Sequence, residues 1–173
     1  MSVLNVTHFL KSKLDEHRLH EAVKTEELYS HVSNSYLKQL FAIMHQRYNA
    51  LFTFMQYKKS SNRHFNAAES RELLGLIKLY EDMQYVLKTT SLSFRLEESY
   101  VSMLEFCKGF LQESGGSEIP EDMPDFHILE YESIFFMSQT ITIQNVSEYI
   151  NAELKLIGEG SYAKVFKYKE TGS

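Results

Sequence analysis

Apolar and polar side chains alternate along most of the chain with the period of an α-helix. The clearest stripe runs from 37 to 55, where apolar residues recur at spacings of four and three, as on a helix with one buried face. Its members are Leu37, Phe41, Met44, Tyr48, Leu51 and Met55, flanked by Leu40 and Phe52. Lys58 and Lys59 followed by Ser60-Ser61-Asn62 predict the end of this helix, because cations are favoured at a helix C-terminus.

Three further helices are predicted by the same period. The first begins near Thr7, with Leu10 and Leu14 one turn apart. The third covers 67–88, with Leu73, Ile77, Tyr80, Met83 and Leu87 on one side. The fourth follows a break at 89–91, and its face would carry Leu92, Leu96, Tyr100, Met103, Cys107 and Phe110 before Gly115-Gly116 stops it.

These elements predict a mainly α fold. Short connections between long helices favour antiparallel neighbours, so we expect an antiparallel helical bundle over 1–116. We expect about the first 115 residues to fold on their own. The stripe from 37 to 55 spans less than three heptads and is widened by its flanking residues, which favours an intramolecular core. A dimerising coiled coil, and hence a homodimer through the bundle, is the alternative.

The pattern changes after Gly116, and 117–152 is predicted to be a linker with a short strand or helix. Ser117 to Asp125 contains both prolines and four acids, which is typical of a surface segment. Glu130 to Met137 fits either a last helical turn or a buried strand. Thr140 to Ile143 alternates and favours a strand, and Val146 to Ala152 favours a short helix.

The segment that carries chemistry runs from Glu153 to Lys169 and reads ELKLIGEGSYAKVFKYK. It predicts a strand, a glycine loop and a second strand. Glycines allow backbone N–H groups to approach phosphate oxygens without an intervening Cβ. A Rossmann site is disfavoured because the residues after the loop continue as a strand, and a P-loop is excluded because no Gly-Lys-Ser/Thr follows at the required spacing.

This segment resembles the start of a protein kinase domain, whose glycine-rich loop reads G-x-G-x-x-G-x-V. The residues that carry the resemblance are Ile157, Gly158, Glu159, Gly160, Ser161, Tyr162, Ala163, Lys164 and Val165, with Ala163 in place of the third glycine. The resemblance implies that Ile157 and Val165 enclose the adenine. It also implies that Gly158, Gly160 and the backbone of 161–163 cover the phosphates of ATP.

The resemblance implies a serine/threonine-type kinase that uses ATP and Mg²⁺, with 1–116 as a regulatory or interaction domain and 153–173 as the truncated start of the kinase domain. The family also needs a strand-three lysine, its helix glutamate, and catalytic-loop and metal-binding acids, none of which falls within 153–173. We therefore expect no catalytic residue and no catalysis in these 173 residues. A non-enzymatic helical interaction module with a fortuitous glycine hairpin is the alternative.

Composition bears on the cellular location and on the kinds of partner and ligand. A net charge of −5 with interspersed signs gives no basic footprint for nucleic acid or an anionic membrane. One cysteine, Cys107, and no apolar run long enough for a membrane span indicate a cytoplasmic protein. Partners would be a protein substrate or regulator.

The seven histidines lack the Glu-x-x-His spacing of di-iron bundles, so no metal site is predicted. Most tyrosines are expected at the edge of the core with their hydroxyls in contact with water.

Overall fold

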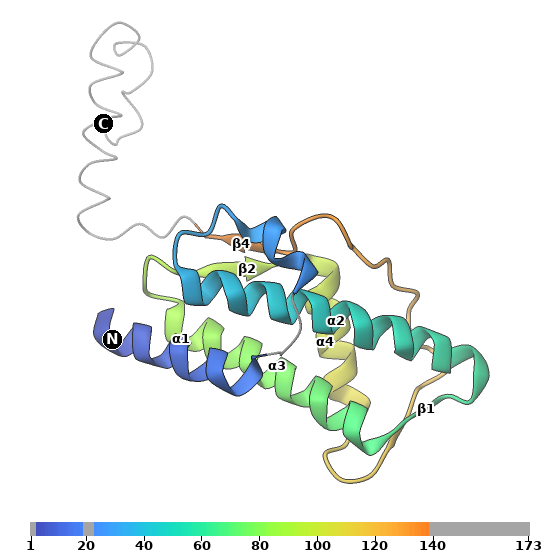
Figure 1. Cartoon of the computed structure of the whole chain (residues 1–173). Helices are drawn as coiled ribbons and strands as arrows, with labels where there is room; N and C mark the ends of the chain where they lie inside the picture. The colour runs from blue at the N-terminus through green and yellow to red at the C-terminus, as the bar shows by residue number, and fades with distance from the viewer. Residues whose placement is uncertain (1–2, 19–22, 139–173) are drawn as a thin grey trace, which may run out of the picture. The chain divides into compact units, whose positions relative to one another are not determined.

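A computed structural model describes residues 3–18 and 23–138 of the chain (Figure 1). All of the elements below belong to the first of two compact units, which comprises Met1–Lys88 and Leu92–Ser138. This unit is mainly α, as predicted, with a few short antiparallel strands. Among the described residues, none of the helices combines the length and the apolar character that crossing a bilayer would require.

The described part of this unit contains four α-helices and one 3₁₀ helix. They are α1 (Val3–His17), η1 (Lys24–Tyr29), α2 (Ser35–Ser61), α3 (Ala67–Leu87) and α4 (Glu98–Phe110). In Figure 1, α2 and α3 lie side by side and run in opposite directions, and α1 packs against both. Helices α2 and α3 therefore begin and end close to their predicted positions. Helix α1 begins at Val3, about one turn before the predicted start near Thr7.

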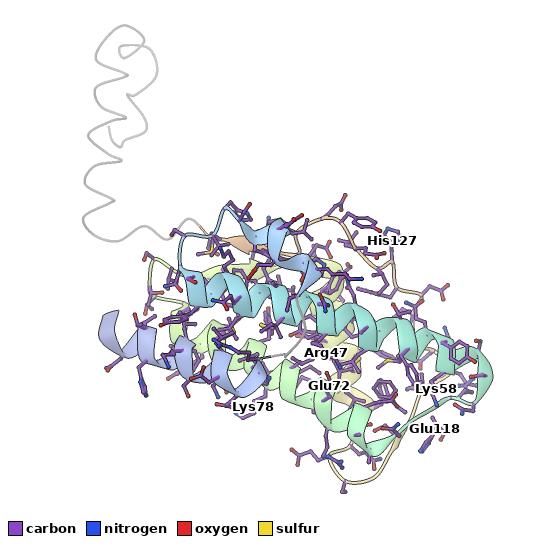
Figure 2. All side chains as sticks on the ribbon, in the orientation of Figure 1. Arg47, Lys58, Glu72, Lys78, Glu118 and His127 are labelled. Atoms are coloured by element: carbon purple, nitrogen blue, oxygen red, sulfur yellow. The ribbon has the colours of Figure 1, made fainter. Side chains whose placement is uncertain are left out.

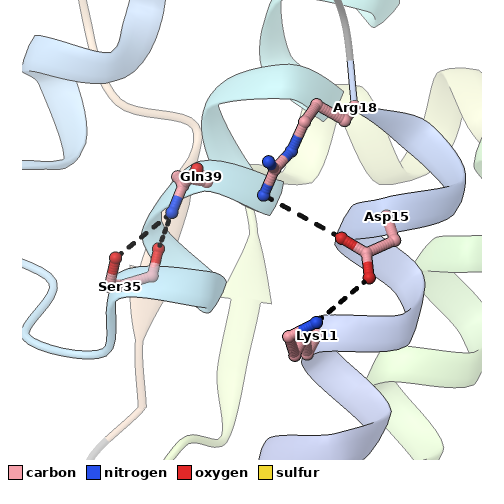
Figure 3. Close-up of polar contacts among 5 residues, drawn as sticks. All are labelled: Lys11, Asp15, Arg18, Ser35 and Gln39. Carbon is pink, nitrogen blue, oxygen red and sulfur yellow. Dashed lines mark hydrogen bonds and ion pairs between the residues drawn. The ribbon is translucent and has the colours of Figure 1, made fainter.

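Local sequence explains where these helices begin. The side chain of Asn34 accepts a hydrogen bond from the backbone N–H of Leu37, which caps α2. Asn66 and Glu69 form a reciprocal capping box at the start of α3. Exposed ion pairs join Asp15 of α1 to Lys11 on the same helix and to Arg18 just after its end, and Gln39 bonds back to Ser35 in the first turns of α2 (Figure 3). Such exposed pairs contribute little to stability.

The stripe predicted on α2 is the centre of the core. Every one of its members is buried within a single chain, including Leu37, Phe41 and Tyr48 at 0% exposure. The stripe therefore serves as intramolecular core. At the edge of this core Arg47 of α2 forms an ion pair with Glu72 of α3, and Figure 2 shows the two side chains facing one another between the helices.

The prediction of a fourth helix that starts at Leu92 is wrong at its N-terminal end. Phe94–Leu96 is strand β2, in which Phe94 and Leu96 are buried and Arg95 is exposed. Helix α4 begins only at Glu98, with Glu97 as its cap, and ends at Phe110, before the glycines. Leu92 and Leu96 lie four positions apart and fit a helical period, but pairing with a strand 40 residues later decides the backbone conformation.

The described part of the predicted linker, 117–138, is built into the helical unit. Strand β3 (Ser117–Glu118) pairs antiparallel with β1 (His64–Phe65), and Ile119 and Met123 are buried. Gly116 is required at this junction, because an added Cβ would lie 2.7 Å from the carbonyl oxygen of Phe65. The acids and prolines that suggested a surface segment thus alternate with apolar residues that reach the core.

Of the two alternatives for 130–137, the structure shows a strand, but only over its last three residues, while 130–134 are irregular. Strand β4 (Phe135–Met137) pairs antiparallel with β2, with Phe94 opposite Met137 and Leu96 opposite Phe135. The ring of Phe135 stacks on Phe41 of α2 with centroids 4.6 Å apart. The strand predicted at 140–143, the helix at 146–152 and the glycine hairpin at 153–169 lie outside the described residues.

Candidate functional site

An irregular segment between β3 and β4, residues 119–134, runs along α2 and is called the strap below (Figure 1). A second stripe of side chains on α2, next to the apolar stripe, contacts the strap. The members of this stripe are His45, Asn49, Phe52, Gln56 and Lys59, again at spacings of four and three. Gln56 donates to the carbonyl of Phe126 (2.9 Å) and Lys59 to the carbonyl of Met123 (2.5 Å). The strap thus gains from side chains the hydrogen bonds that a strand or helix would supply.

Leu129 is the most tightly held residue of the strap. Its carbonyl oxygen accepts hydrogen bonds from His45 Nε2 (2.7 Å) and from Asn49 Nδ2 (3.0 Å). Its backbone N–H donates to the hydroxyl of Tyr100 on α4 (2.9 Å), which in turn donates to Asn49 Oδ1 (2.6 Å). Both backbone groups of Leu129 are therefore satisfied by side chains from two helices, and its neighbours in the strap are held in place.

The hydroxyl of Tyr29 extends the same network to the end of the strap. It accepts hydrogen bonds from the backbone N–H groups of Ile134 (2.9 Å) and Phe135 (3.4 Å). The hydroxyl therefore donates its own proton in a hydrogen bond to Nδ1 of His45, 2.8 Å away. This assigns His45 as a neutral imidazole with its proton on Nε2, where it donates to the carbonyl of Leu129.

Burial shifts the acidities of this network. It lowers the pKa of His45 below its ordinary value and raises the pKa of Tyr29 and, to about 12, that of Tyr100. All three groups are therefore neutral at physiological pH. The network is a structural support and holds no charged nucleophile or base.

A groove of about 700 Å³ lies beside this network. Three segments line it: η1, one face of α2 from Gln46 to Thr53, and the strap residues on either side of Leu129. Its apolar surface includes Leu28, Ala50 and Ile128. A pocket of this size falls in the range of small-molecule and peptide side-chain sites. Because the network fixes Leu129, the groove is formed without any ligand.

The charged groups in the groove are two carboxylates and one ammonium. Lys24 and Glu27 lie three positions apart on η1, which places them on the same face of a 3₁₀ helix. Glu130 lies on the strap, next to Tyr131, whose side chain is 82% exposed. Neither Glu27 nor Glu130 forms an ion pair with any residue of 3–18 or 23–138.

The residues predicted for nucleotide binding, from Ile157 to Val165, all lie outside the described residues. Two pairs of possible metal ligands have helical spacing in the sequence, His17 with His20 and Glu27 with His31. His17 ends α1 while His20 is not described, and Glu27 lies in η1 whereas His31 lies in the turn after it. Over 3–18 and 23–138, no three His, Cys, Asp or Glu side chains come together as a metal site would need.

The expectation that most tyrosines keep wet hydroxyls is wrong for three of them: Tyr29 and Tyr100, which build this site, and Tyr48, which donates to the carbonyl of Leu76 on α3. Tyr29, Tyr48 and Tyr100 are fully buried, and each hydroxyl bonds inside the protein. Tyr131, on the rim of the groove, was not singled out from the sequence. The one signal in the sequence for this network is that His45 and Asn49 lie one helical turn apart on α2, and these residue types are also common on wet faces.

No protein-family model matches this chain, and neither a curated protein sequence nor a solved structure matches it.

Proposed function

We propose that this chain is the N-terminal part of an ATP-dependent serine/threonine protein kinase. The helical unit acts as its regulatory or interaction domain, and 153–173 begin the small lobe. The single observation that carries the proposal is the order of residues from Gly158 to Val165, which follows G-x-G-x-x-G-x-V with Ala163 at the third glycine. An apolar strand pattern before the loop and an aromatic, basic strand pattern after it support the proposal.

In this proposal the glycine loop covers the phosphates of ATP in a cytoplasmic enzyme. Mg²⁺ and the transferred phosphoryl group are held by residues that follow Ser173 in the kinase family's order of motifs. The 173 residues alone are expected to bind no ATP, because a nucleotide cleft needs both lobes of the catalytic domain. Isothermal titration of this chain with Mg·ATP should therefore give no heat of binding.

The sequence that follows Ser173 in the gene is the first test. A Val/Ala-x-Lys strand within about 20 residues, and catalytic-loop and Asp-Phe-Gly motifs further on, would support the proposal. The full protein should then transfer the γ-phosphate of ATP to itself or to a generic acceptor, and replacing the strand-three lysine with methionine should abolish the transfer. A gene that continues without these motifs would refute the kinase assignment.

A non-enzymatic interaction module is the second candidate, and the groove beside the strap favours it. The groove is formed in advance, has a partly apolar lining and carries two carboxylates that have no ion-pair partner within 3–18 and 23–138. The two candidates differ in one observable property. An interaction module keeps its binding activity when Gly158 and Gly160 are both replaced with alanine, whereas a kinase loses phosphotransfer.

A further inference from the structure

The groove beside the strap has a definite chemical preference. We propose that it binds a peptide segment of a partner protein through an arginine side chain, whose guanidinium group lies between Glu27 and Glu130 and stacks on Tyr131. This inference rests on the described residues alone. It is independent of the glycine loop, so it can fail or succeed separately from the kinase proposal.

Two carboxylates remain available as acceptors among the polar groups of the groove. Both polar atoms of Asn49 are already used by Leu129 and Tyr100, and Gln46 Oε1 accepts from the backbone N–H of Lys24 (2.7 Å). The carboxylates of Glu27 and Glu130 have no ion-pair partner among the described residues. Two carboxylates contributed by different walls of one groove are matched by a planar group with several N–H donors, which is the guanidinium of arginine.

The aromatic and apolar surfaces suit the same side chain. Tyr131 is 82% exposed, although it lies two positions after Leu129, which three helical side chains hold. A guanidinium stacks on such a ring through cation–π attraction. The methylene stem of arginine would then cover the apolar surface formed by Ala50 and Ile128.

The charge pattern distinguishes a peptide from two other occupants. Lys24 lies one turn of η1 before Glu27, and its ammonium would repel a second cation but attract a peptide carbonyl group. A polyamine is therefore a poorer match than a peptide with a single arginine. A second copy of this chain is also disfavoured, since the chain carries a net charge of −5 and the groove contributes to it.

The test uses the full 173-residue chain labelled with ¹⁵N and two small probes, Nα-acetyl-arginine-N-methylamide and its citrulline analogue. Citrulline keeps the shape of arginine and lacks its charge. The arginine probe should shift the backbone amide signals of Leu129, Glu130 and Tyr131 in a saturable way, and the citrulline probe should bind at least about fivefold more weakly. Equal responses to the two probes, or no shifts at these amides, would overturn the proposal.

Variants of the groove residues and competing ligands test whether binding depends on the named side chains and on arginine. The double variant Glu27→Gln, Glu130→Gln should weaken binding of the arginine probe about fivefold or more, and Tyr131→Ala should weaken it to a smaller extent. Glu113→Gln removes one carboxylate from the loop after α4 and should leave binding unchanged, and a comparable loss of affinity there would reveal non-specific attraction. If spermidine binds as tightly as the arginine probe, the groove binds a polycation and the inference is refuted. If the same amide signals shift when the protein is diluted without any probe, the occupant is a second copy of the chain and the inference is also refuted.

Discussion

Nε2 of His45 lies 2.7 Å from the carbonyl oxygen of Leu129, although 84 positions separate the two residues. His45 is completely buried in α2, and Leu129 lies in a strap without regular secondary structure. A buried imidazole with partners on both nitrogens thus joins a helix to a distant irregular segment. The stability of the unit and the shape of the groove both depend on this junction.

Replacing His45 with phenylalanine should destabilise the protein by about 2 kcal/mol, because the buried hydroxyl of Tyr29 loses its acceptor and Leu129 loses one donor. Urea unfolding of the full chain, followed by helical dichroism, measures this change. His127→Gln is the matched control: His127 is exposed on the strap (Figure 2), and its replacement should change the free energy of unfolding by less than about 0.5 kcal/mol. Equal effects of the two substitutions would contradict the role of the buried imidazole.

Stability should fall as the pH drops below about 6.5, the ordinary pKa of histidine. Burial lowers the pKa of folded His45, so in this range the unfolded chain binds a proton that the folded chain does not. The contribution is complete above the unfolded pKa and is lost progressively until the folded pKa is reached. The free energy of unfolding should therefore decrease between pH 7.5 and 5.5.

The pH dependence can be assigned by comparing two histidines. The variant His45→Gln should show a shallower decrease than the natural chain over the same interval. Burial also lowers the pKa of His17, so His17→Gln should remove a separate share of the slope. A His45→Gln variant with an unchanged slope would show that this imidazole does not contribute.

Replacing Tyr29 with phenylalanine should cost about 1–3 kcal/mol, because the buried N–H of Ile134 loses its acceptor. Hydrogen exchange gives a local readout: the amide of Ile134 should exchange faster in this variant. Tyr57→Phe removes a hydroxyl from a ring that is 67% exposed and should leave both quantities unchanged. Unaltered exchange at Ile134 in Tyr29→Phe would mean that another group satisfies this amide.

Truncation after Ser114 should give a chain that unfolds without cooperativity, whereas truncation after Ser138 should keep a sharp thermal transition. This revises the expectation from the sequence that about 115 residues fold alone. Residues 117–138 place Ile119, Met123, Ile134 and Phe135 in the core, and losing a buried phenylalanine alone costs about 3–5 kcal/mol. A cooperative, strongly helical transition in the shorter chain would contradict this prediction.

Cys107 should react with a thiol reagent such as DTNB only after the protein unfolds. The side chain is buried next to Met55, and burial raises its pKa to about 12, so almost no thiolate exists at pH 8. Labelling in buffer should be slow, and it should become rapid in urea above the unfolding midpoint. Rapid labelling of the folded chain would place this cysteine at the surface.

Helix α2 shows which part of the fold is predictable from the sequence. Its first stripe, Leu37 to Met55, consists of strongly apolar residues whose period alone predicts a buried face. Its second stripe, His45 to Lys59, has the same period but mixes polar and aromatic residues, which bond equally well to water or to backbone. Only the arrival of the strap, 64 to 84 positions later in the chain, decides that these side chains face protein.

The same distinction, between structure set by local sequence and structure set by distant segments, applies to the other elements of the fold. Sequence determined the helices that depend on local capping and apolar period, and it supplied the glycine-loop motif on which the kinase proposal rests. Tertiary structure alone decided that 94–96 is a strand, that 117–138 belongs to the helical unit, and that η1, α2 and the strap enclose a groove. Local patterns reflect the chain's own period, whereas pairing and enclosure depend on segments that meet only after the chain has folded.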